Sequence, residues 1–157
     1  MKPSVVSIIV PTLNSEATIA KCLTTISKQT YPAIELVVVD NHSVDRTTTI
    51  ARRFTKNVFI KGPERSTQRN YGATKASGKY LCMIDSDMEL GPNVIQECVD
   101  AITKSSSVTG VVIPEESFGI GFWARCKRLE RRFYLDVPYI EAARFFLRKN
   151  FLEVNGY

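Results

Sequence analysis

Short apolar runs alternate with helical patterns through the first two-thirds of the chain, and this alternation limits the folds open to it. The runs rich in β-branched residues cover 5–10, 34–39, 57–60, 80–84 and 109–113. Helical spacing lies between them, as in Ile19, Leu23 and Ile26. Near-continuous apolar strands joined by helices are typical of parallel sheets buried on both faces. The sequence therefore predicts an α/β fold with a mostly parallel sheet flanked by helices.

The length of 157 residues, 44% of them hydrophobic, predicts one domain with a sizeable core. No apolar run is long enough to span a bilayer, and the first residues lack the apolar stretch and cleavage site of a secretory signal. The four cysteines have no CxxC spacing and sit in apolar patterns, which favours buried reduced thiols over a zinc site. These features predict a cytoplasmic protein.

Polar residues follow three of the predicted strands at the point where each strand ends. They are Pro11 to Asn14, Asp40 to Ser43, and Asp85 to Asp87. Sheets of this kind bind ligands beyond the carboxyl ends of their strands. The three clusters are therefore expected to converge on one edge of the sheet and form a binding site.

The pair Asp85 and Asp87, on either side of Ser86, has the chemistry of a metal site. Mg²⁺ characteristically combines one or two carboxylates with phosphate oxygens of a substrate. The alternative is a loop aspartate that caps the helix beginning near Pro92. Asp40 has the chemistry to accept a hydrogen bond from a nucleobase or a ribose hydroxyl, and its alternative is a turn-forming residue.

Arg65 and Arg69 lie four residues apart at the start of a predicted helix. This spacing places both guanidinium groups on one helix face, which suits a diphosphate, although a solvated helix face has the same pattern. The chain has no GxGxxG after the first strand and no GxxxxGK[ST]. These absences disfavour a dinucleotide site and a P-loop.

Four motifs stand in order along the chain: VSIIVPTLN, QTYPAIELVVVDNHSVD, RNYG with ASGKY, and DSD. Together they resemble the motifs of the inverting family 2 glycosyltransferases. VSIIVPTLN at 6–14 is similar to the family's apolar strand followed by P-T-Y-N, and QTYPAIELVVVDNHSVD at 29–45 resembles Q-x-Y-P-x-x-E-I-I-V-V-D-D-G-S-x-D. RNYG at 69–72 with ASGKY at 76–80, and DSD at 85–87, match R-N-x-G, A-x-G-x-Y and D-x-D. The chain departs from the pattern at Leu13, where tyrosine is common, and at Asn41-His42, where D-G is usual.

The resemblance implies a GT-A fold, which is Rossmann-like, and a nucleotide-diphosphate sugar as donor, linked to UDP or GDP. Asp87 would hold Mn²⁺ or Mg²⁺ against the diphosphate, with Asp85 beside the ribose and sharing the metal site. The donor-binding residues that the resemblance implies are Pro11, Thr12, Asn14, Asp40, Arg69 and Asp85. To these we add Arg65, from its helix spacing with Arg69, and Ser86, between the two aspartates. A sugar nucleotidyltransferase is disfavoured, since no Gly-rich, Arg-containing phosphate loop follows the first strand.

The second half resembles a subgroup of the family through WARCKRLER at 123–131 and IEAARFF at 140–146, on the acceptor side. FLEVNGY at 151–157 is similar to F-x-E-V-G-G-F, which the family continues to an E-D pair whose aspartate is the general base. We therefore expect residues 1–114 to form the donor half and 115–157 to begin the acceptor side of one domain, truncated before that base. Glu115, Glu116 and Glu141 are the candidate replacements, and a catalytically silent nucleotide-sugar-binding module is the alternative.

Basic residues are concentrated in one segment, which carries nearly all of the chain's net charge of +5. Between Trp123 and Arg132 a single acid, Glu130, accompanies the bases Arg125, Lys127, Arg128, Arg131 and Arg132. The spacing predicts a helix with one apolar stripe, either packed on the core or facing an anionic membrane surface or lipid-linked acceptor. Because the basic residues are limited to this one segment, a nucleic-acid partner is disfavoured. The expected localisation is cytoplasmic or peripheral at the membrane.

Overall fold

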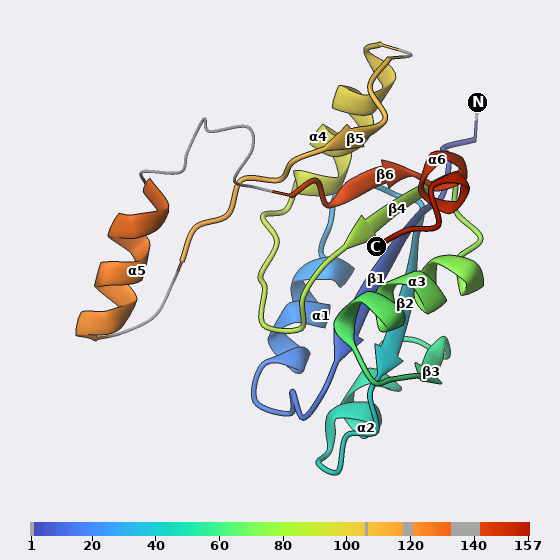
Figure 1. Ribbon diagram of the computed structural model, residues 1–157. Coiled ribbons are helices and arrows are strands. Elements are labelled where there is room, and N and C mark those ends of the chain that lie inside the picture. The colour runs from blue at the N-terminus through green and yellow to red at the C-terminus, as the bar shows by residue number, and fades with distance from the viewer. Residues whose placement is uncertain (1, 106, 118–120, 133–141) are drawn as a thin grey trace.

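A six-stranded sheet forms the centre of the computed structural model, which describes the chain except for residues 1, 106, 118–120 and 133–141. The strands are β1 (Val6–Thr12), β2 (Ile34–Asp40), β3 (Val58–Ile60), β4 (Tyr80–Met83), β5 (Gly110–Val111) and β6 (Phe145–Leu147). Their order across the sheet is β3-β2-β1-β4-β6-β5 (Figure 1). Strands β1 to β4 are mutually parallel where they pair, which confirms the predicted mostly parallel sheet.

The end of the sheet differs from the sequence-based expectation. The run 109–113 forms only the two-residue strand β5, and β5 joins the sheet through β6 rather than through β4. Strand β6 is antiparallel to both neighbours. Its position is fixed by Phe145, which is fully buried and stacks on Tyr80 with ring centroids 5.5 Å apart.

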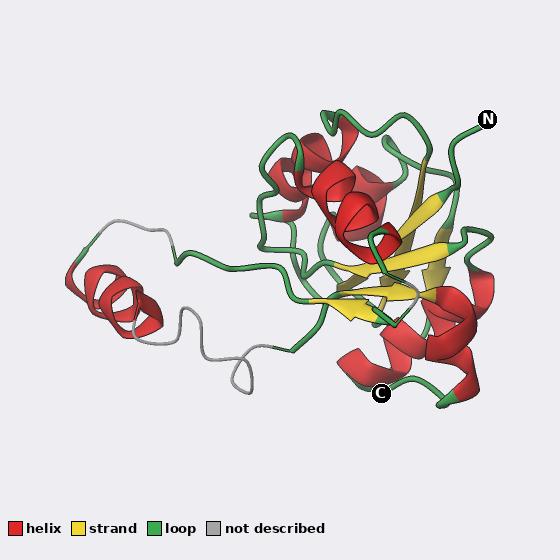
Figure 2. Cartoon of the chain, turned by 90° about the horizontal axis from the view of Figure 1, so that it is seen from above, coloured by secondary structure: helices red, strands yellow, loops and turns green. Residues whose placement is uncertain are grey.

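Helices cover both faces of the sheet, as Figure 2 shows from above. They are α1 (Ile19–Ser27), α2 (Thr47–Ala51), α3 (Arg65–Lys75), α4 (Val94–Thr103), α5 (Phe122–Arg132) and α6 (Arg148–Glu153). Buried side chains of α1, α2 and α4 form one core cluster with the sheet, and those of α3 together with Phe151 of α6 form the other. The two layers hold the strand ends in place.

Helix α5 confirms the predicted helix but stands apart from the sheet in both views (Figures 1 and 2). Phe122 and Leu129 of the predicted apolar stripe are 71% and 57% exposed, so of the two alternatives, packing on the core is not observed for these residues. Cys126 is exposed as well, whereas the other three thiols are buried as predicted. Among the residues that the structure describes, no helix is long and apolar enough to cross a membrane.

Gly72 allows α3 to lie close against β1 and β2. A Cβ atom at this position would come within 2.5 Å of Ile9 Cγ2 and 3.2 Å of Val39 Cγ2. Both neighbours are themselves fully buried branched side chains. The close approach of α3 to the sheet therefore depends on the missing side chain.

We expect Gly72→Ala to lower the free energy of unfolding by up to about 2 kcal/mol in urea titrations. Overpacking a core costs about 1–3 kcal/mol, and the better helix propensity of alanine recovers about 1 kcal/mol of this. The exposed Thr74→Ala on the same helix is the control and should change stability by no more than about 0.5 kcal/mol. A stabilised Gly72→Ala variant would contradict the close packing of α3.

Candidate functional site

The polar clusters after β1 and β4 meet at the carboxyl edge of the sheet, as the sequence predicts. They line a cavity of about 310 Å³ together with the start of α3. Its lining residues are Pro11, Leu13, Asn14, Ser15, Ala17, Thr18, Arg65, Asp85, Ser86 and Asp87. Six of the nine predicted donor-site and metal residues thus lie together, whereas Thr12, Asp40 and Arg69 are not part of the lining.

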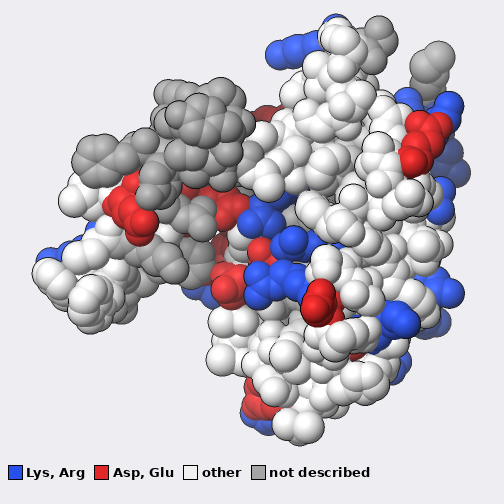
Figure 3. Space-filling view, viewed as in Figure 1, with Lys and Arg blue, Asp and Glu red and all other residues white. Residues whose placement is uncertain are grey.

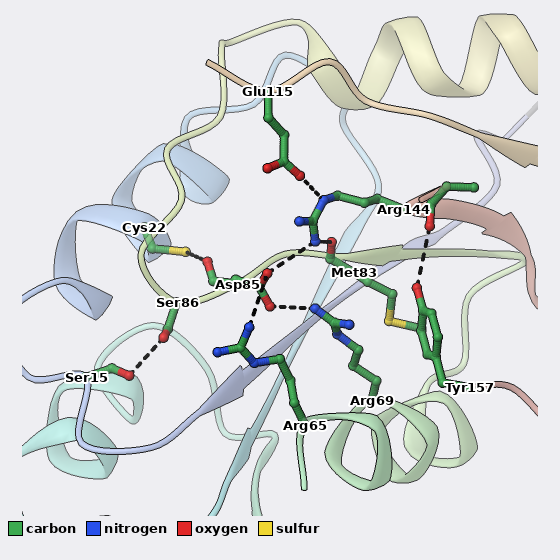
Figure 4. A network of polar contacts seen from close by, with 11 residues as sticks. Ser15, Cys22, Arg65, Arg69, Met83, Asp85, Ser86, Glu115, Arg144 and Tyr157 are labelled. Carbon is green, nitrogen blue, oxygen red and sulfur yellow. Dashed lines mark hydrogen bonds and ion pairs between the residues drawn. The ribbon is translucent and has the colours of Figure 1, made fainter. Parts of the chain in front are cut away.

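Asp85 is the centre of a cluster of arginines (Figure 4). Its Oδ1 accepts a hydrogen bond of 2.6 Å from Nη2 of Arg69. Its Oδ2 lies 3.3 Å from Nη1 of Arg144 and 3.9 Å from Nη1 of Arg65. Because the Asp85 side chain is only 13% exposed, these cations replace most of the water that a carboxylate requires. Both oxygens face guanidinium groups, so the metal contact predicted for Asp85 stays a prediction.

Arg144, immediately before β6, was not among the predicted site residues. Its guanidinium donates to Glu115 through Nε and contacts Asp85 through Nη1. Burial disfavours its charge, but the hydrogen bond and charge of Glu115, with those of Asp85, outweigh burial and raise the pKa of Arg144. The sequence did offer one indication, because Arg144 stands directly before an apolar run. A charge next to a buried strand needs a partner of opposite charge.

Arg69 is held between Asp85 and the last residue of the chain. Its guanidinium lies 5.3 Å from the ring centroid of Tyr157. Asn70 fixes that tyrosine through two hydrogen bonds of 3.0 Å to its backbone. Burial raises the pKa of Tyr157, although Arg69 and Arg144 oppose the shift. The Nε of Arg69 is the one buried side-chain nitrogen or oxygen in the described part of the chain that lacks a hydrogen-bond partner.

Asp40 lies in a buried network behind the cavity. Its Oδ1 accepts hydrogen bonds from Oγ of Ser43 at 2.5 Å and Oγ1 of Thr12 at 2.9 Å, and its Oδ2 accepts one from the Ser43 amide at 2.8 Å. These hydrogen bonds give Asp40 the turn-forming role that the sequence analysis left open as the alternative to a ligand-binding role. The contacts of Thr12 and Asp40 with a donor nucleotide remain predictions.

Asn14 links the loops that follow β1 and β2. Its backbone has a left-handed φ of 46°, a conformation that asparagine tolerates better than most residues. Its amide donates to Oγ of Ser43 at 2.8 Å, and its Oδ1 accepts from the Val44 amide at 3.0 Å. The cavity wall at Asn14 is therefore fixed by hydrogen bonds that also hold the Asp40 turn.

Gln68 is a second residue that the sequence analysis missed. It is buried on α3, and its Nε2 donates to the backbone oxygens of Thr12 and Val39 at 2.9 and 2.6 Å. It ties the helix that carries the arginines to the ends of β1 and β2. A polar residue one position before Arg69 gave no distinctive signal, because glutamine is common on exposed helix faces.

Asp87 is exposed at the cavity, next to Ser86, whose Oγ lies 2.8 Å from Oγ of Ser15. Within the described ranges, no group of three His, Cys, Asp or Glu residues could form a complete protein metal cage. A carboxylate at an open cavity instead suits a hard cation whose other ligands include phosphate oxygens of the substrate. The donor set therefore fits Mn²⁺ or Mg²⁺ only together with a phosphate ligand.

Two of the candidate replacements for the general base, Glu115 and Glu116, are not part of this cavity lining. Glu115 is paired with Arg144, and Glu116 is exposed. Glu141 falls outside the described residues, as do the side chains of Lys127, Arg128, Arg131 and Arg132. Figure 3 shows acidic and basic side chains gathered on the face between α5 and the sheet.

We expect Asp85→Asn to lower the free energy of unfolding by about 1.5–3 kcal/mol, because charge-assisted hydrogen bonds are lost and two partly buried guanidinium groups remain. Asp87→Asn, two residues away and exposed, should change it by no more than about 0.5 kcal/mol. Thermal or urea unfolding of both variants measures the difference. Equal effects of the two substitutions would contradict the central position of Asp85.

Known proteins share both the sequence pattern and the fold. The model of the family described as "Glycosyl transferase family 2" matches residues 7–155. Glycosyltransferase AglE of Haloferax volcanii is 37% identical over 91 residues, which are 52% of this chain and 30% of that protein. The poly(ribitol-phosphate) β-N-acetylglucosaminyltransferase TarS of Staphylococcus aureus is 28% identical over 130 residues, 71% of this chain and 23% of TarS. The chain thus spans less than a third of the length of either relative.

Solved structures of glycosyltransferases are similar to this chain in fold. The crystal structure of TarS 1–349 superimposes with a TM-score of 0.64 at 28% identity, over 75% of this chain and 38% of that one. The mannosyltransferase PcManGT of Pyrobaculum calidifontis has a TM-score of 0.80 at 21% identity, over 99% of this chain and 48% of that one, which shows the fold alone. The sheet is that of the GT-A fold. Because the family model covers nearly the whole sequence, the chain belongs to glycosyl transferase family 2.

Proposed function

We propose that the cavity at the carboxyl edge binds the nucleoside diphosphate part of a UDP- or GDP-linked sugar for metal-assisted, inverting transfer. The observation that carries this proposal is the charge arrangement around the cavity. Arg65 and Asp87 face the same space, while Asp85 is already neutralised by the buried arginines. A diphosphate needs cations, and this arrangement supplies one directly and a carboxylate for a metal beside it.

Ligands of the related structures support the donor class. Crystal structures of TarS hold UDP or UDP-GlcNAc, and that of PcManGT holds GDP-Man with Mn²⁺. In the proposed complex Pro11 and Asn14 line the nucleoside end, and Ser86 lies between the two aspartates. Thr12 and Asp40 support that wall from behind through the hydrogen bonds already described.

Asp87 is the residue that we assign to the metal. When bound, Mn²⁺ or Mg²⁺ would act as a Lewis acid toward the departing nucleoside diphosphate. Arg65, 68% exposed at the cavity, contributes a fixed positive charge to the same phosphates. Asp85 keeps Arg69 and Arg144 in place behind them, and we assign it no more than a shared part in the metal site.

An inverting displacement also needs a base for the acceptor hydroxyl, which contributes about 10²–10⁴-fold in rate. Of the candidate bases that the structure describes, neither Glu115 nor Glu116 lines the donor cavity, and Glu141 lies outside the described residues. A module that binds a nucleotide sugar without turnover is the second candidate. Release of UDP or GDP in the presence of sugar acceptors would identify an enzyme, whereas donor binding without release would identify the module.

The acceptor that we infer is a polysaccharide or a lipid-linked sugar. The name of TarS specifies a poly(ribitol-phosphate) acceptor. A lipid-linked acceptor would require work at a membrane surface, to which the basic residues of α5 are suited.

Calorimetric titration with UDP and GDP, with and without Mn²⁺, tests the donor site. We expect one nucleotide to bind and Mn²⁺ to strengthen its binding at least tenfold, because the metal joins Asp87 to the diphosphate. Asp87→Asn should abolish the metal effect, since it removes the charged ligand.

The matched control is Asp100→Asn, which removes an exposed carboxylate from α4 and should leave binding unchanged. If neither nucleotide binds, the proposed donor is wrong. If binding is unaffected by Asp87→Asn, the metal assignment is wrong.

A further inference from the structure

Helix α5 exposes apolar side chains that a folded domain ordinarily covers. Phe122, Trp123 and Leu129 are 71%, 81% and 57% exposed. The rings of Phe122 and Trp123 lie edge to face with centroids 5.4 Å apart, so they form one apolar tip at the start of the helix. Scattered exposed residues need no explanation, but three large ones on a helix of eleven residues indicate a surface that is covered in use.

The charge of α5 identifies what would cover it. Its sequence holds five basic residues and one acidic residue, and Arg125 is exposed. A second copy of the helix would bring like charges together, which disfavours self-association. A nucleic acid would leave the apolar tip against phosphates. Negatively charged lipid headgroups above an acyl boundary satisfy both the cations and the apolar side chains.

We propose that α5 docks the protein onto an anionic bilayer, with Phe122, Trp123 and Leu129 entering the headgroup boundary, Arg125 at the lipid phosphates, and the net positive charge of the helix sequence attracting the anionic surface. Tryptophan favours this interface because its ring is apolar and its N–H is polar. The docking does not depend on the nucleotide that the cavity binds, so the two proposals can fail separately.

The ends of the segment that carries α5 adjoin the candidate donor site. Glu115 precedes the helix and Arg144 follows it, and the two side chains form an ion pair. Arg144 also contacts Asp85. Docking through α5 would therefore tether the cavity to the membrane through the chain on either side of the helix. If the proposed function is correct, the donor would then be bound at the membrane that carries lipid-linked acceptors.

Trp123 is the single tryptophan of the chain, so its fluorescence reports on α5 alone. In the free protein we expect the emission of a solvated indole that acrylamide quenches readily. Vesicles with phosphatidylglycerol at low salt should shift the emission to shorter wavelength and protect it from acrylamide. Pure phosphatidylcholine vesicles should have little effect, and high salt should reverse the shift because it screens the headgroup charge.

Substitutions separate the contribution of the basic residues to membrane binding from that of the apolar residues. Changing Arg125, Arg128 and Arg132 together to Gln should lower partitioning onto phosphatidylglycerol about a hundredfold, at about fivefold for each charge. The matched control changes Arg52, Arg53 and Lys56 to Gln, which removes the same charge from an exposed segment elsewhere and should cost severalfold at most. Phe122→Ser with Leu129→Ser should weaken partitioning with no change in charge.

Three results would overturn the proposal. The first is an emission spectrum that anionic vesicles leave unchanged. The second is an equal loss in the two triple variants, which would indicate attraction by net charge alone. The third is a free protein whose Trp123 is already protected from acrylamide, which would show that protein rather than lipid covers α5.

Discussion

The pairing of one carboxylate with three guanidinium groups organises the carboxyl edge of this protein. Asp85 follows β4, yet its partners come from α3 and from the residue before β6. Because arginine does not lose its proton at accessible pH, the buried Arg69 and Arg144 require a nearby anion whenever the chain is folded. Asp85 provides it, and the segments that carry the arginines are thereby held against the end of β4.

Among the described residues, the printed ion pairs around Asp85 bring together three arginines and two carboxylates. Arg65, Arg69 and Arg144 contact Asp85, and Glu115 pairs with Arg144. Arg65 is the most exposed of the three, and it lies at the cavity. The buried part of the cluster is therefore balanced, and the remaining positive charge faces the space where we place a diphosphate. Asp87 also lines this cavity but does not belong to the arginine cluster, and we propose that it binds the metal ion.

The parts of this structure that local patterns determine could be predicted, and the parts that depend on distant contacts could not. The apolar runs located β1 to β4, and their polar ends located Asn14, Asp85 and Asp87. The insertion of β6 between β4 and β5 depends on the packing of Phe145 against Tyr80, residues 65 positions apart, which no local pattern specifies.

The same distinction applies within the site. Asp40 has the appearance of a ligand-binding carboxylate in the sequence, but its hydrogen bonds with Thr12 and Ser43 are visible only once the two loops are placed together. Arg144 and Gln68 were missed because their partners are far away in sequence. For α5, periodicity identified the helix and its stripe, but could not show that the stripe faces solvent.

A crystal structure of the chain with UDP or GDP and Mn²⁺ would test the central claim most directly. Our account predicts Mn²⁺ bound by Asp87 and the diphosphate, Arg65 at the phosphates, and Asp85 still in contact with Arg69 and Arg144. A metal bound primarily by Asp85 with its arginines displaced, or a nucleotide outside this cavity, would contradict the account.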